Sequence, residues 1–169
     1  IASCLVGSEM CIRDRKRNGI ATSSYNMIGM PWQSRDSINE TINLNRRCEP
    51  TFVNVSIFIP FEGTNLLTRL RKEGYIGDDL LLGDETRATV NVPGDMTLDE
   101  IERLHKVFTL WCKAPDKELN KIRKYESDPN KYYNDILFLQ NKYLAFENPT
   151  PVSLSKGMND AYPEGMKNN

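Results

Sequence analysis

Two short apolar segments, each ending at a proline, constrain the fold of this chain most. Residues 21–31 (ATSSYNMIGMP) and residues 52–60 (FVNVSIFIP) are typical of β-strands, and the second is rich in β-branched residues. Proline supplies no hydrogen-bond donor to a sheet, so each strand is expected to stop there. The chain is therefore expected to contain two strands separated by about 20 residues, which is enough for a crossover connection.

Each expected strand is followed by a segment with helical periodicity. Residues 34–47 (SRDSINETINLNRR) begin with the potential cap Ser34 and carry an apolar stripe of Ile38, Ile42 and Leu44. Residues 63–74 (GTNLLTRLRKEG) predict a second, shorter helix that ends at a left-handed glycine. Strand, helix, strand and helix with short loops predict an α/β fold with parallel strands.

Both expected strands carry polar residues on one face. Because a parallel sheet that is covered by helices on both sides is usually apolar on both faces, this pattern favours the inside of a barrel, with the site at the strand ends. An edge strand with one face in solvent is the alternative interpretation. The polar positions are Thr22, Ser24 and Asn26 on the first strand, and Asn54 and Ser56 on the second.

The downstream part of the chain predicts three helices. Thr97 and Glu100 form a potential capping box, and an apolar stripe at helical spacing follows it. Residues 115–125 and 132–146 predict two further helices, separated by an Asp-Pro turn. We expect the stripe to lie in the core, with the lone His105 beside it; its members are Ile101, Leu104, Phe108 and Trp111.

The N-terminal segment has a different character. Cys4 and Cys11 lack the further soft ligands that a zinc or iron–sulfur site needs, and nothing around them suggests a secreted disulfide framework. Residues 10–14 (MCIRD) match a translation of ATG TGT ATA AGA GAC, the transposase end used in sequencing libraries. We therefore expect residues 1–15 to be translated adapter, and the native reading frame to continue upstream.

Composition excludes several classes of protein. The 22 basic and 23 acidic residues nearly cancel, so no nucleic-acid partner or anionic membrane is expected. No apolar run approaches the roughly 20 residues that span a bilayer, so no membrane span and a cytoplasmic location are expected. Cys48 and Cys112 are expected to be small buried hydrophobic residues. Residues 148–169 predict a mobile tail.

Two segments in this order resemble the radical S-adenosylmethionine enzymes, especially those that carry a cobalamin-binding domain. Residues 28–34 (IGMPWQS) are similar to that family's IGxPxET element, and residues 60–66 (PFEGTNL) to its P-Y/F-P-G-T-x-L element. Glu73-Gly74 is similar to an E-G element, and residues 108–111 with the helices that follow resemble a C-terminal extension. The resemblance covers about residues 20–146.

This resemblance implies the C-terminal portion of a partial TIM-like (β/α) barrel, followed by a helical extension. Residues 16–86 would be the last two βα units, and residues 87–147 the extension. The strand ends would contact the nucleoside of S-adenosylmethionine through backbone groups and apolar side chains. Polar side chains in the barrel interior could add further contacts. The implied residues are Met27, Ile28, Gly29, Ile57, Phe58 and Ile59 near the nucleoside, and Asn26, Asn54 and Ser56 in the interior. Alternatively, each of them only fills the barrel.

The sequence departs from the family pattern at several positions. Gln33, Ser34 and Glu62 stand where the family has Glu, Thr and Pro, and the chain contains no CxxxCxxC motif for a [4Fe–4S] cluster. We therefore expect an inactive fragment of a radical enzyme. The parent would use S-adenosylmethionine, a [4Fe–4S] cluster and cobalamin for methyl transfer or another radical carbon modification of a small-molecule substrate. The alternative is a non-catalytic α/β module that binds a nucleotide-like ligand or a partner protein.

Overall fold

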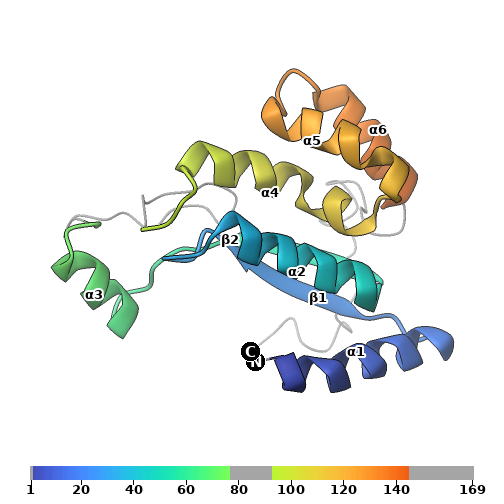
Figure 1. Cartoon of the computed structure of the whole chain (residues 1–169), viewed down its shortest axis with the longest axis horizontal. Helices are drawn as coiled ribbons and strands as arrows, with labels where there is room; N and C mark the ends of the chain where they lie inside the picture. Colours follow the sequence, from blue (N-terminus) through green and yellow to red (C-terminus); the bar gives the residue numbers. More distant parts are fainter. Residues whose placement is uncertain (1, 77–92, 145–169) are drawn as a thin grey trace, which may run out of the picture.

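The computed structural model describes residues 2–76 and 93–144, which form a mixed α/β fold (Figure 1). The N-terminal helix α1 spans Ala2–Arg17. The elements that follow it are β1 (Ser23–Ile28), α2 (Arg35–Cys48), β2 (Phe52–Ile57), α3 (Asn65–Lys72), α4 (Leu98–Lys113), the 3₁₀ helix η1 (Asp116–Glu118), α5 (Leu119–Ser127) and α6 (Tyr133–Tyr143).

The two strands pair in parallel, as the sequence predicts. Ser23 lies opposite Phe52 at one end of the ladder, and Ile28 lies opposite Ile57 at the other. The connection between the strands contains α2, which crosses one face of the sheet with α4 beside it (Figure 1). Within the described residues the sheet has these two strands, so the barrel stays an expectation.

The main core lies between the sheet and two helices, α2 and α4. It contains apolar side chains from all four elements, and Leu104 and Phe108 of α4 are completely buried. The buried members are Ile28, Ile38, Ile42, Val53, Ile57, Ile101, Leu104, Phe108 and Cys112. Ile38 and Ile42 of α2 therefore cover the same face of the sheet as the stripe of α4, whereas Leu44, also expected in the α2 stripe, is only half-buried and lies outside this core.

The helix ends confirm the expected caps. Ser34 accepts a hydrogen bond from the backbone N–H of Ser37 at 3.1 Å. At the start of α4, Thr97 and Glu100 form the complete capping box. Gly74 has φ +78°, the left-handed conformation predicted for the end of α3.

A second apolar cluster joins α4 to the C-terminal helices. It contains Val107, Leu110, Ala114, Ile122, Ile136, Leu139 and Leu144. Trp111 packs against this cluster and also against the main core. One helix therefore serves both cores, which ties α5 and α6 to the α/β unit.

The polar positions of the two strands lie on opposite sides of the sheet, which corrects one sequence expectation. Asn26 lies opposite Val55, whereas Asn54 lies opposite Tyr25, and opposite partners in a sheet share a face. Asn45 of α2 donates from Nδ2 to Asn26 Oδ1 at 2.8 Å, so Asn26 faces the helix. The prediction that Asn26, Asn54 and Ser56 point to a common interior is therefore wrong for Asn26.

The helix α1 contacts the C-terminal end of α2 through polar groups. Arg13 donates from Nε and Nη2 to the backbone oxygen of Arg47 at 3.2 and 3.1 Å, and Lys16 pairs with Glu49. A foreign segment is expected to show no consistent packing, and these contacts of Arg13 run against that expectation. Met10 and Cys11 are exposed, and Ile12 is half-buried. The adapter origin of the segment stays a prediction.

Two further expectations concern the ends of the chain and the membrane. The proposed mobile tail, residues 148–169, lies outside the described residues. Among the helices that the structure describes, none has the length and apolar character needed to cross a bilayer.

Candidate functional site

The carboxyl ends of β1 and β2 meet at one edge of the sheet, next to the two motifs. The N–H of Phe58 donates to the oxygen of Ile28 at 2.8 Å and extends the ladder beyond β2. Gly29 then turns the chain with φ +75°, and a Cβ there would lie 3.2 Å from Cγ2 of Ile101. Both the backbone conformation and the close approach of α4 therefore require glycine.

The loop after Gly29 is stabilised by a reciprocal pair of hydrogen bonds. The N–H of Met30 donates to Gln33 Oε1 at 3.2 Å, and the N–H of Gln33 donates to the oxygen of Met30 at 3.0 Å. A glutamate at position 33 would offer the same acceptor oxygen. Gln33 thus supplies the hydrogen bond that a glutamate would supply here, without the charge.

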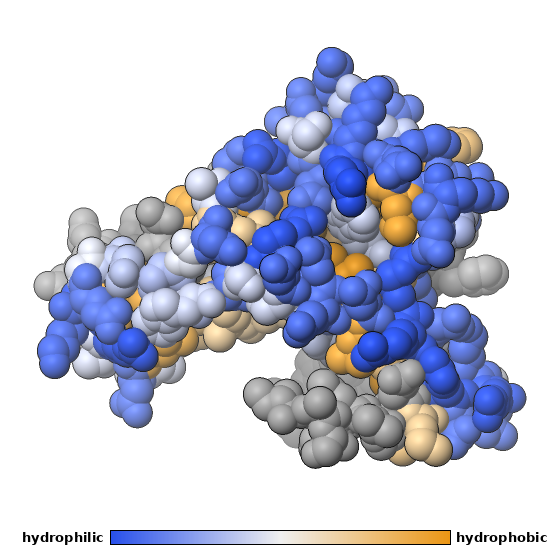
Figure 2. All heavy atoms as spheres, viewed as in Figure 1, coloured by the Kyte–Doolittle hydropathy of each residue, from blue (hydrophilic) through white to orange (hydrophobic). Residues whose placement is uncertain are grey.

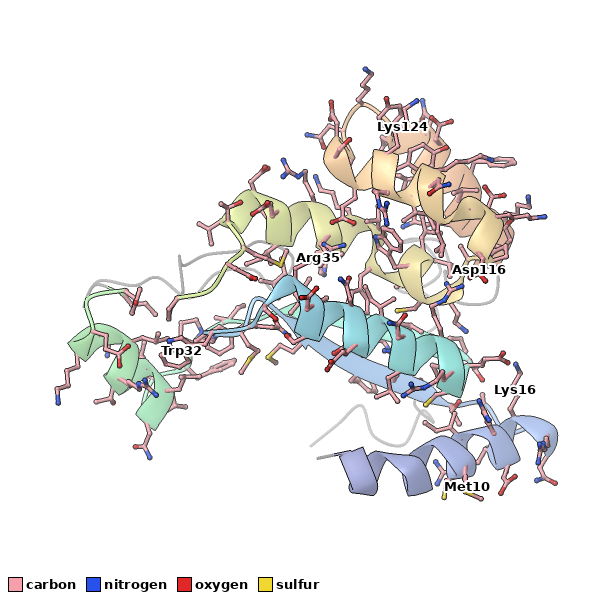
Figure 3. The ribbon with its side chains drawn as sticks, viewed as in Figure 1. Met10, Lys16, Trp32, Arg35, Asp116 and Lys124 are labelled. Atoms are coloured by element: carbon pink, nitrogen blue, oxygen red, sulfur yellow. The ribbon has the colours of Figure 1, made fainter. Side chains whose placement is uncertain are left out.

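Trp32 occupies an unusual position in the same loop. It has φ +60°, a conformation rare for a bulky residue, and its N–H donates to the oxygen of Pro93. Its ring is 46% exposed, and the guanidinium carbon of Arg69 lies 4.1 Å from the ring centroid (Figure 3). The first motif is therefore held to α3 by a cation–π contact.

Glu62, in the second motif, also contacts α3. Its carboxylate accepts hydrogen bonds from Nη1 of Arg71 at 3.0 Å and from Nη2. The hydrogen bonds from Arg71 lower the pKa of Glu62 below its ordinary value. An ion pair thus fixes the loop where the family has a proline.

Four of the nine implied site residues have buried side chains. Ile28 and Ile57 belong to the main core, while Phe58 packs with Leu67 and Leu70 of α3. Ile59 is also buried. These residues have only backbone groups to offer to a ligand.

Three other implied residues lie on the face of the sheet opposite α2 and α4. No helix among residues 2–76 and 93–144 covers this face, which is called the uncovered face. Met27 is 49% exposed and pairs in register with Ser56, and Asn54 pairs with Tyr25, which is 84% exposed. The sequence analysis missed Tyr25, although strand alternation places it on the same face as Met27. The uncovered face thus presents an aromatic ring, a thioether and two polar side chains.

The covered side of the strand ends has no room for a nucleoside. A cavity of about 10 Å³ lies there, bounded by residues that include Gly29, Met96 and Ile101. This volume is about that of a single water molecule. Any ligand of nucleoside size at these strand ends would have to approach from the uncovered face.

The described residues contain no cluster of side chains that could hold a metal ion. No cluster of three or more His, Cys, Asp or Glu side chains occurs there. Cys48 and Cys112 are buried, as predicted, and Cys11 is exposed. His105 is half-buried, with Nε2 at 3.2 Å from the oxygen of Val55, where it links α4 to β2.

A comparison of the chain with models of protein families, with curated proteins and with solved structures found no match.

Proposed function

We propose that this chain is the C-terminal part of a radical S-adenosylmethionine enzyme, of the type that carries a cobalamin-binding domain. The parent would transfer a methyl group or carry out another radical modification of carbon. In this proposal the chain contributes one wall of the cosubstrate site. It is inactive alone, because it contains no CxxxCxxC motif.

The observation that carries the proposal is the placement of the two motifs. Residues 28–34 and 60–66 each follow one strand of a parallel pair, and so both lie at the same edge of the sheet. Gly29 brings the backbone of the first motif into a left-handed turn at this edge. Ligands of open and closed parallel α/β folds bind at the carboxyl ends of strands, which supports a site here.

The residues of the chain suit contact with S-adenosylmethionine but do not suit the binding of a [4Fe–4S] cluster. The uncovered face offers Met27, Asn54 and Ser56 beside the strand ends, which suits contact with a nucleoside. A reduced [4Fe–4S] cluster would supply the electron that cleaves the sulfonium of S-adenosylmethionine. The cysteines of this chain lack the spacing to hold such a cluster, so its ligands would have to come from an upstream segment.

Recovery of the upstream reading frame from uncut genomic DNA tests the proposal. We expect a CxxxCxxC motif upstream, and we expect the longer protein to bind iron after anaerobic reconstitution and to form 5′-deoxyadenosine in the presence of a reductant. The 169-residue chain, treated identically, should do neither. A longer protein without the motif, iron or deoxyadenosine would contradict the proposal and favour a non-catalytic binding module.

A further inference from the structure

A cavity of about 690 Å³ lies where α2, α4 and α5 meet. Its volume is within the range of small-molecule sites. Apolar groups line part of it, including the indole of Trp111, Ile42 and Leu119. Figure 2 shows that the surface over these helices is mostly hydrophilic, with apolar residues visible between them. The cavity thus combines apolar walls with a polar rim.

Every carboxylate that lines the cavity already accepts hydrogen bonds from the protein. Glu126 accepts from Nη1 and Nη2 of Arg35 at 2.5 and 3.1 Å, and from Trp111 Nε1 at 2.7 Å. Glu100 accepts from Thr97 in the capping box, and Asp95 accepts from the backbone N–H of Arg35 at 3.2 Å. The carboxylates of the cavity are therefore engaged.

The donors of the cavity are only partly engaged. Arg46 donates to the backbone oxygens of Trp111 and Ala114, both at 2.8 Å, and Arg103 pairs with Asp99 outside the cavity. Arg123 of α5 also lines the cavity, and so do Asn39 and Asn43 of α2. Within the described part of the chain, no hydrogen bond or ion pair joins the side chains of these three residues to another group. A guanidinium and two amides, all on solvent-exposed residues, thus line one space without a partner among the described residues.

We propose that this cavity binds a small organic anion, which carries a carboxylate or a phosphate on an apolar body. The anionic group pairs with Arg123 and accepts hydrogen bonds from Asn39 and Asn43, while the apolar body lies against Trp111. Of the four lining arginines, Arg35 pairs with Glu126, Arg46 with Asp116 and Arg103 with Asp99, so within the described residues Arg123 is the one without a carboxylate partner. An isolated cation would gain little here, because every lining carboxylate already has donors.

The fluorescence of Trp111, which lines the cavity, can report binding. The chain has two tryptophans, and Trp32 lies in the loop after β1, so Trp32→Phe leaves Trp111 as the only indole fluorophore. Phenyl phosphate and benzoate are the two anionic probes, and they distinguish a preference for phosphate from one for carboxylate. Benzyl alcohol and benzylamine are the neutral and cationic controls. We expect a saturable change in Trp111 fluorescence with at least one anion and with neither control.

Two substitutions on α5 test the role of Arg123. Arg123→Ala should weaken binding of the anion by about tenfold, as expected for a charge-assisted hydrogen bond. Lys124→Ala is the matched control, because it removes the adjacent positive charge, which contacts the ring of Tyr132 at 5.1 Å and does not line the cavity (Figure 3). Its affinity should be unchanged. Equal binding of benzylamine, unaltered binding by Arg123→Ala, or no saturable signal with either anion would overturn the proposal.

Discussion

At the scale of single residues, Gly29 is under two separate constraints. Its φ of +75° disfavours any side chain, and a Cβ would also contact Ile101 at 3.2 Å. We predict that Gly29→Ala lowers the free energy of unfolding by about 1–3 kcal/mol, because backbone strain and overpacking add. Urea unfolding of the 169-residue chain, followed by circular dichroism, measures this loss.

Gly63 provides the control for this experiment. It has φ +79°, but nothing lies within 4 Å of a Cβ built there. Gly63→Ala should therefore cost about 1 kcal/mol from the backbone alone. Equal losses in the two variants would show that α4 does not press on Gly29.

Asn45 is the polar residue on which the covered face of β1 depends. It is buried, its Oδ1 accepts from Ser24 Oγ at 2.6 Å, and its Nδ2 donates to Asn26 Oδ1 at 2.8 Å. We predict that Asn45→Ala lowers the free energy of unfolding by about 1–3 kcal/mol, because two partly buried groups lose their partner. Asn43→Ala, at a solvent-exposed position that lines the cavity and whose side chain has no hydrogen bond to another described group, should change it by less than about 0.5 kcal/mol.

The orientation of Asn26 shows where residue-level prediction fails. Alternation along β1 correctly groups Ser24, Asn26 and Ile28 on one face, but alternation alone does not say which face the helices cover. The deciding partner is Asn45, which lies 19 residues away from Asn26 on α2. Asn45 of the helix forms hydrogen bonds with Ser24 and Asn26 of the strand, so these polar strand residues lie on the face that the helix covers. Polar residues on a strand therefore did not show which face of the sheet is in solvent.

At the scale of elements, the capping box of α4 gives the fold a pH-dependent component. Glu100 accepts hydrogen bonds from the N–H and hydroxyl of Thr97, and these lower its pKa below the ordinary value of 4.5. A lowered pKa in the folded state means that the carboxylate stabilises the fold above about pH 4.5. This contribution is lost as the pH falls through the lower, folded-state pKa.

The substitution Glu100→Gln tests this linkage. We expect the variant to be less stable than the parent chain at neutral pH, and the difference to shrink as the pH falls below 4.5. Urea midpoints across an acid pH series measure this convergence. Glu40→Gln, an exposed substitution on α2, is the control and should follow the parent chain throughout. A constant gap between Glu100→Gln and the parent would show that the cap carries no proton linkage.

The elements themselves were largely predictable, because local signals determine them. Ser34, Thr64 and Thr97 each cap the helix that the sequence predicts after them. The strands and their parallel pairing follow from the two apolar segments and the helical crossover between them. The bounds differ by a few residues, since β1 begins at Ser23 and β2 ends at Ile57.

At the scale of the whole molecule, local sequence patterns do not predict which helices pack against one another. The cavity beside Trp111 depends on Arg35 reaching Glu126 across 91 residues of sequence. Nothing in the periodicity of α2 or α5 indicates that these helices meet. The same limit applies to the two cores on α4, because a single helical stripe does not reveal that Val107 and Leu110 face a different set of helices from Leu104.

The uncovered face of the sheet gives the last prediction. Met27 is 49% exposed on this face, whereas Val53 is 5% exposed on the face that α2 and α4 cover. We predict that Met27→Thr changes the free energy of unfolding by less than about 0.5 kcal/mol, since threonine suits a solvated strand. Val53→Thr has nearly the same shape as the parent residue but buries a hydroxyl, and it should cost about 1–3 kcal/mol. Urea unfolding of both variants measures the difference. A loss in Met27→Thr as large as that in Val53→Thr would mean that this face is packed in the 169-residue chain, and it would remove the surface on which the proposed cosubstrate wall depends.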